Sequence, residues 1–291
     1  WARSGSRSAE AALSPAHPEW GTRGQLSEQQ EAALGQVLEV ARAVLLAHGE
    51  TFPTDHLWAW LRGGGEGLGE EERLEDLCLM FLRARQFVVA KSIEMLMGVV
   101  KWRGTTRPWE LTMEHAQHPS AQNTFFFTGE VTRHGMPFFY GMMRLMDRHL
   151  MVVDNFKKAI TYMLEEALYR SSFRNGQIAV AFDFANWSFT KHVSPTAYKE
   201  MIHMLQDNYP ERLGKVFLMN YPTTISSAYA LVSPLMDKRT TSKLHWIAKK
   251  PSEAVQAEFE DPASAPIWLG GNSPFRLPGV DHDKEWQAYA L

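Results

Sequence analysis

The order of hydrophobic and polar positions divides the chain into a helical N-terminal part and a part in which strands alternate with helices. In the first part apolar residues recur at spacings of three and four, which is typical of helices with one buried face. Ser27 and Gln30 form a candidate capping box before the first stripe, and the Gly-rich run 62–69 predicts a loop. We therefore expect a small helical unit over residues 22–107. Its apolar stripes are Leu34, Val37, Leu38, Ala41, Val44 and Leu45; Leu74, Leu77, Cys78 and Phe81; and Val89, Ile93, Leu96, Met97 and Val100.

After Trp109 the apolar residues form short runs instead of stripes. Such runs predict strands, and the first two are joined through His134 and Gly135 as in a hairpin. The run 178–184 is almost continuously apolar, which indicates a strand covered on both faces. The predicted strands occupy residues 124–128, 136–146, 178–184, 216–219 and 243–248.

Three helices are expected between these strands. Asp154 is a candidate N-cap for the first, Ser194 and Pro195 begin the second, and the third begins near Ser226. Strands that alternate with helices predict right-handed crossovers onto a mainly parallel sheet. The fold class is therefore α/β: an N-terminal helical unit followed by a mainly parallel β-sheet flanked by helices.

Composition narrows the classes of function. The chain has 291 residues, is 45% hydrophobic and carries a net charge of -3, so no basic field favours nucleic acid as a partner. Cys78 is the single cysteine, which excludes a disulfide framework and favours a reducing compartment. No apolar run reaches the roughly 18 residues that a spanning helix needs. We expect residues 1–21 to form a disordered tail; a cleaved transit peptide is the alternative.

The sequence offers little catalytic chemistry. It contains no G-x-S-x-G elbow, no P-loop and no G-x-G-x-x-G between a strand and a helix. His115 and His118 have the spacing of zinc ligands, but Pro119 follows and no Glu lies between them, which favours a polar loop. Asp183 could act as a base, yet no His or Ser stands at a recognisable spacing. We therefore expect neither catalysis nor a metal or cofactor.

The run "FLRARQF" and the helix ending in "KWR" (74–103) resemble the N-terminal helical unit of CRAL-TRIO lipid-binding proteins. The segments "HGMPFFY", "FDFANWSFT", "NYPERLGKVFLMNYP", "SPLMDKRTTSKL" and "IWLGGN" follow in the family's order. The resemblance covers residues 25–272. It implies a lipid-binding domain over 120–272 and a C-terminal tail over 273–291.

The resemblance also implies a function. One phospholipid, phosphatidylinositol or phosphatidylcholine, would lie in a deep apolar pocket and be transferred or presented between membranes, with no bond made or broken. A mobile helix near 225–243 would gate the pocket at the membrane, through an apolar face of Tyr229, Val232, Leu235 and Met236. We expect a cytoplasmic monomer that associates peripherally with membranes, and a lipid kinase or a small GTPase as a possible protein partner.

In the phosphatidylinositol-binding branch, polar side chains hold the head group. Arg85 and Lys243 would neutralise a phosphate, and Glu211 would accept from inositol hydroxyls. Each has a structural alternative: Arg85 could pair with a helix carboxylate, and Glu211 with Arg212 or Lys215. By position, the residues implied to bind the head group are Arg85, Ser188, Thr190, Glu211, Thr240 and Lys243.

The chain departs from the family at three places. Gln86 replaces a phosphate-binding lysine, Met136 stands where arginine is frequent, and Phe125–Phe127 stand where tyrosines often line the phosphate site. Phe127, unlike tyrosine, has no hydroxyl. These changes leave two alternatives open: a carrier or sensor of a non-phospholipid hydrophobe such as a sterol, tocopherol or retinoid, and a protein-interaction or membrane-recruitment module.

Overall fold

The computed structural model describes residues 21–63, 68–116, 125–169, 176–236, 238–248 and 251–273. The two predicted tails lie outside these ranges, except for their innermost residues, Gly21 and Ser273.

The N-terminal unit consists of four helices, α1 (Glu28–Thr51), α2 (His56–Gly63), α3 (Glu70–Ala84) and α4 (Val89–Thr106). The capping box is confirmed, because the Ser27 side chain accepts from the Gln30 amide and the Gln30 side chain accepts from the Ser27 amide. Sequence reasoning missed α2 and predicted a loop from residue 62, which lies in its last turn. An eight-residue helix is too short to show a clear period.

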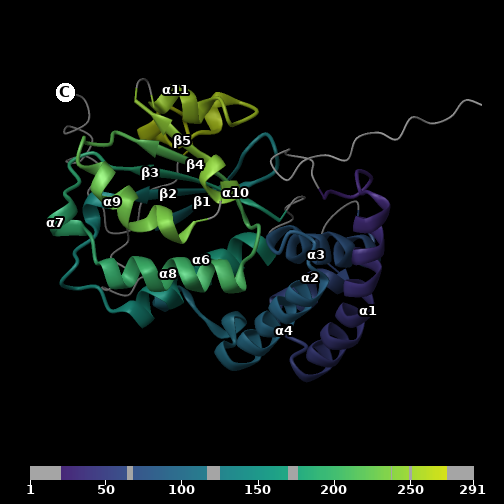
Figure 1. The fold of residues 1–291 in the computed structure, drawn as a ribbon. Helices are drawn as coiled ribbons and strands as arrows, with labels where there is room; N and C mark the ends of the chain where they lie inside the picture. The colour runs from purple at the N-terminus through teal and green to yellow at the C-terminus, as the bar shows by residue number, and fades with distance from the viewer. Residues whose placement is uncertain are drawn as a thin grey trace, which may run out of the picture.

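The second part contains a five-stranded sheet of β1 (Phe125–Val131), β2 (Pro137–Met142), β3 (Ile178–Asp183), β4 (Leu213–Met219) and β5 (Leu244–Ile247). The strands lie in the order β1-β2-β3-β4-β5 (Figure 1). β1 pairs with β2 antiparallel and the remaining pairs are parallel. The predicted α/β class and its mainly parallel sheet are therefore confirmed.

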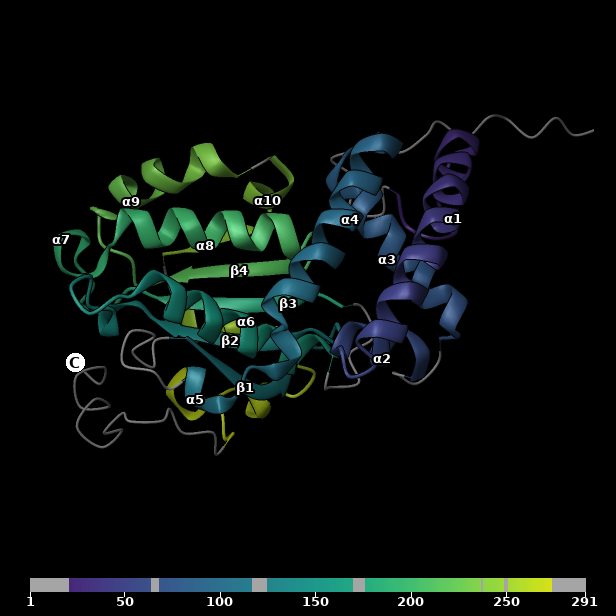
Figure 2. The ribbon, with the colours of Figure 1, turned by 90° about the horizontal axis from the view of Figure 1, so that it is seen from below.

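Helices α6 (Val153–Tyr169), α8 (Pro195–Asn208) and α9 (Ile225–Val232) lie across one face of the sheet (Figure 2). A C-terminal segment with α11 (Pro251–Gln256) covers the other (Figure 1). The shorter elements are η1 (Pro108–Glu110), α5 (Met113–Ala116), η2 (Met143–Leu145), α7 (Phe189–His192), η3 (Ser233–Leu235), α10 (Lys238–Ser242), η4 (Pro262–Ser264) and η5 (Ile267–Leu269).

Side chains of β3 show that both faces are covered. Ile178 and Val180 belong to the cluster under α6, α8 and α9, whereas Ala179 and Ala181 belong to the cluster with Phe259. The alternation follows from the two-residue period of a strand.

Several predicted boundaries are wrong, and three of them bear on the site. α6 begins at Val153, so Asp154 lies in the first turn instead of capping it, and the strand predicted over 136–146 ends at Met142. The expected gate is not one helix, because α9 ends at Val232 and a 3-10 turn with Pro234 separates it from α10. Proline has no amide proton and its ring collides with the preceding turn, so it interrupts an α-helix.

A buried charge network joins the helical unit to the sheet domain. Arg103 of α4 is 1% exposed and donates from both terminal nitrogens to the Glu165 carboxylate of α6, at 2.8 and 2.9 Å. Its Nε atom donates to Asp55 at 2.9 Å, and His48 Nε2 lies 2.8 Å from the same carboxylate. Removal of any one of these charged side chains would leave a buried charge uncompensated. The network therefore fixes the position of the helical unit relative to the sheet domain.

The free energy of unfolding should therefore depend on pH in the acid range. Burial opposes ionisation of Glu165, but Arg103, together with hydrogen bonds from His56 and Tyr209, lowers the pKa of this carboxyl to about 2. The charged form thus stabilises the fold above the unfolded-state pKa near 4.3, and this contribution, roughly 3 kcal/mol, is lost as pH falls toward 2.

We expect Glu165→Gln to lower the free energy of unfolding at pH 7, with the difference from wild type shrinking between about pH 5 and pH 2. Urea titrations at a series of pH values measure it, with Glu110→Gln, an exposed partner of Arg107, as the control. A difference that stays constant with pH would contradict this account of Glu165.

Candidate functional site

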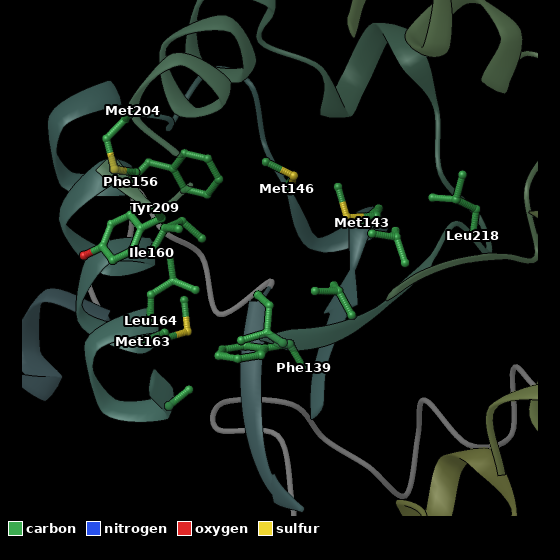
Figure 3. Packing of buried hydrophobic residues seen from close by; sticks show 14 of the residues in the cluster. Phe139, Met143, Met146, Phe156, Ile160, Met163, Leu164, Met204, Tyr209 and Leu218 are labelled. Atoms are coloured by element: carbon green, nitrogen blue, oxygen red, sulfur yellow. The ribbon is translucent and has the colours of Figure 1, made fainter. Parts of the chain in front are cut away.

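A cavity of about 270 Å³ lies between the sheet and the helices that cross it. β4 contributes Val216 and Leu218 to its wall, and α6 contributes Phe156, Ile160 and Leu164. Figure 3 shows these α6 side chains facing Met143, Met146 and Leu218 across the space. The wall is built almost wholly of hydrocarbon and thioether groups, so the site suits an apolar ligand.

The cavity wall follows from the helical period of α8. Tyr198, Met201, Ile202 and Leu205 recur at spacings of three and four, and all four line the cavity. These residues formed the stripe that the sequence predicted. The sequence pattern shows only that this face of the helix is apolar. It does not distinguish a face packed against the sheet from one that lines a cavity.

α9 and the turn after it cover one side of the cavity. Tyr229, Val232 and Met236 of the predicted gate face line the hollow, whereas Leu235 is absent from the lining. The carbonyl of Leu235 instead accepts a hydrogen bond from Gln206 of α8 at 2.6 Å. The gate face therefore points inward in this structure, and its contact with a bilayer stays a prediction.

The carboxyl end of the sheet carries a pair of hydroxyls. Ser188 and Thr190, in and beside α7, follow the end of β3, and their side-chain oxygens lie 3.2 Å apart. Trp187, next to Ser188, lines the cavity. The structure thus places the hydroxyl pair beside one end of the hollow.

The amino end of the sheet carries a charge cluster. Glu211, just before β4, lies 3.0 Å from Arg239 Nε, 3.6 Å from Arg83 Nε and 4.0 Å from Lys243 Nζ. Lys243 Nζ also donates to the Leu213 carbonyl at 2.6 Å. Three cations of the described residues thus lie around the Glu211 carboxylate in a mostly buried place, and such a group of cations suits an anionic ligand.

Burial lowers the pKa of the Arg83 guanidinium below its usual value; Glu211 opposes this shift and Arg239 adds to it. The cluster therefore holds cations under mutual repulsion. A second anion would relieve that repulsion.

Arg83 and Arg239 were missed by sequence reasoning, which chose Arg85. Positions two apart on a helix point to nearly opposite sides, so Arg83 and Arg85 cannot face the same site. Arg85 follows the last residue of α3, and its guanidinium donates to the Ala84 carbonyl at 3.4 Å. Arg239 could have been found from its position next to Thr240, one of the implied residues. The Thr240 carbonyl accepts from the Lys243 amide, so this turn brings the segment close to Lys243.

The six residues implied to bind the head group do not gather at one place. Glu211 precedes β4 and Ser188 follows β3, and these strands are parallel, so the two groups lie at opposite edges of the sheet. β4 has seven residues and spans roughly 20 Å. Head-group binding by any of the six implied residues stays a prediction.

Two other charged residues near β4, Arg212 and Lys215, have structural partners other than Glu211. Arg212 is buried and donates to the Gly176 carbonyl and to the Tyr169 hydroxyl, at 2.9 and 3.0 Å. Lys215 lies 2.8 Å from both oxygens of Glu258. The proposed pairing of Glu211 with Arg212 or Lys215 is therefore wrong.

The remaining chemical candidates have local roles. His115 Nδ1 accepts from the Thr112 amide at 3.1 Å, while His118 lies outside the described residues. Burial raises the pKa of the Cys78 thiol to about 12. Asp183 accepts from the Tyr140 hydroxyl at 2.6 Å and from Asn220 at 3.0 Å, which ties three strands together.

The described ranges contain neither a metal-binding cluster nor a helix that could span a membrane. These ranges hold no group of three or more His, Cys, Asp or Glu side chains placed to bind a metal ion. Within the same residues, every helix is too short or too polar to span a bilayer.

Comparison with known proteins agrees with this arrangement. The family model of the CRAL/TRIO domain matches residues 121–271, just over half of the chain. Patellin-3 of Arabidopsis thaliana is 25% identical over 259 residues, which are 85% of this chain and 52% of the relative. The chain thus spans about half the length of that protein.

The Sec14 cytosolic factor of Schizosaccharomyces pombe is 29% identical over 243 residues, 75% of this chain and 84% of the relative. The crystal structure of Sfh5 has the same fold, with a TM-score of 0.61 and 14% identity, over 91% of this chain and 97% of that one. The matched domain, the lidded cavity and the shared fold agree. The chain belongs to the CRAL/TRIO domain family.

Proposed function

We propose that this chain binds one phospholipid, phosphatidylinositol or phosphatidylcholine, in the cavity under α9 and transfers or presents it between membranes. The observation that carries the proposal is a hollow with an apolar wall, closed by a short lid and bordered by polar clusters at both ends. One Arabidopsis thaliana relative, 24% identical over 212 residues, is named phosphatidylinositol/phosphatidylcholine transfer protein SFH9.

The apolar wall makes lipid extraction feasible. Each buried methylene contributes about 0.8 kcal/mol. An acyl chain that moves from a bilayer into this cavity exchanges one apolar environment for another, so the net change in free energy is small. Exchange between membranes then needs no chemical energy.

The cavity is small for this cargo. Its volume of about 270 Å³ lies just below the roughly 300–1,000 Å³ of small-ligand pockets, so a two-chain lipid must displace the lid. The lid is suited to this, because Ile225 is the one buried residue of α9 among those described. Pro222 before α9 and Pro234 after it bound a segment that can move as a unit.

The two polar clusters suit different head groups. Three cations around Glu211 can neutralise a phosphate, while the carboxylate accepts from inositol hydroxyls. Ser188 and Thr190 offer two hydroxyls that can donate hydrogen bonds to the phosphate of a zwitterionic choline head group. Because the clusters lie at opposite edges, one head group occupies one cluster at a time.

A second candidate is an uncharged hydrophobe such as a sterol or tocopherol. Phe125 lines the cavity where a tyrosine would offer a hydroxyl, and Gln86 removes one cation. Mass spectrometry of organic extracts of the purified protein separates this cargo from a phospholipid. A pure interaction module is disfavoured, since the protein's own side chains leave the cavity open.

We expect the protein to move phosphatidylinositol and phosphatidylcholine between donor and acceptor vesicles. Lys243→Ala should slow phosphatidylinositol transfer about tenfold, because a charge-assisted contact of about 1.5 kcal/mol is lost, and should spare phosphatidylcholine. The matched control is Lys215→Ala, which removes a lysine from the opposite face of the sheet. If wild type transfers neither lipid at any salt concentration, transfer is excluded as the main activity.

Filling the hollow should block cargo without unfolding the protein. Ala228 of the lid lines the cavity, whereas Ala230, two residues on, is exposed. We expect Ala228→Trp to reduce lipid loading at least tenfold, since the indole occupies the space of the acyl chains, while Ala230→Trp loads like wild type. Loading is measured by lipid phosphorus per protein and folding by circular dichroism. Equal loading of both variants would show that cargo binds elsewhere.

A further inference from the structure

One cavity-facing hydroxyl has only a weak hydrogen-bond partner. Tyr198 of α8 lines the hollow and donates its hydroxyl proton to the thioether sulfur of Met146 at 3.1 Å. A thioether is a poor acceptor beside any oxygen. Burial raises the pKa of the Tyr198 hydroxyl above its usual value.

Few other residues of the cavity wall carry a polar group. Apart from Tyr198, the lining residues with a polar tip are Trp187, Tyr229 and Trp246. Tyr229 and Trp246 pack edge to face at the lid. Trp187 is buried at the end of the hollow near Ser188, and its indole Nε1 has no hydrogen-bond acceptor among the described residues.

Both donors belong to the same end of the cavity. α7, directly after Trp187, contacts η2, and η2 leads into Met146, the residue that Tyr198 reaches. Two donors with weak acceptors or none, in an otherwise apolar wall, are favourable only if a ligand supplies an oxygen. A neutral carbonyl oxygen suits both donors, because it accepts a hydrogen bond without bringing a charge into the apolar wall.

We propose that Tyr198 is a specificity residue that donates its hydrogen bond to an ester carbonyl of a bound acyl glycerolipid, with Met146 as its resting partner in the lipid-free protein. This inference rests on the proposed function and names the part of the cargo that the cavity recognises. Ester carbonyls join a lipid's head group to its acyl chains.

The test uses two phosphatidylcholines with the same C16 chains and head group, one with ester links and one with ether links. Each is offered to the lipid-free protein as a minor component of vesicles, and uptake is titrated. We expect wild type to favour the diester about three- to tenfold, the contribution of one neutral hydrogen bond. Tyr198→Phe should bring this ratio to about one by weakening diester uptake alone.

Two further variants separate recognition from packing. Met146→Leu conserves volume and removes the resting acceptor, so diester uptake should rise about twofold or more. Tyr221→Phe deletes a hydroxyl outside the cavity lining and should keep the wild-type ratio. Because Tyr198→Phe removes a poorly paired hydroxyl from apolar surroundings, the lipid-free variant should melt no lower than wild type.

The outcomes are distinct. Equal uptake of the two lipids by wild type, or equal weakening of both by Tyr198→Phe, overturns the role of Tyr198 and leaves phospholipid transfer standing. Uptake of neither lipid by wild type overturns the proposed function, and the inference with it.

Discussion

The constraint on which the structure depends is that a parallel sheet must be covered on both of its faces. On one face the C-terminal segment packs directly onto the sheet, with Phe259 edge to face against Phe138. On the other, α6, α8 and α9 meet above a space that they do not fill. The hollow is therefore a consequence of how one face is covered. Its wall is apolar because that face belongs to the core.

A second constraint places charge beside this hollow. The pairing of Arg103 with Asp55 and Glu165 holds the helical unit against α6. α3 belongs to that unit, so the same docking brings Arg83 to Glu211. The cluster at the amino end of the sheet thus combines residues from the helical unit, from the start of β4 and from α10. A site built in this way depends on the buried network even though it shares no residue with it.

Sequence patterns predicted the elements better than their junctions. The long stripes of α1 and α6 and the apolar run of β3 were found because their periods extend over many residues. The eight-residue α2 and the break at Pro234 were missed, since local signals there compete with a neighbouring pattern. For the site, motif position selected Glu211 and Lys243, which the structure brings together. It chose Arg85 over Arg83 because a motif records order along the chain and not the side of the helix that a residue faces. Only the sheet topology shows that Ser188 lies at the opposite edge from Glu211.

The central claim is that the cavity under α9 takes up one whole lipid. Native mass spectrometry of the purified chain after incubation with phosphatidylinositol and phosphatidylcholine vesicles tests it most directly. The account predicts a complex of one protein with one phospholipid, which the bulkier indole of Ala228→Trp prevents. A spectrum that holds only the bare chain, or several lipids per chain that persist in Ala228→Trp, would contradict it.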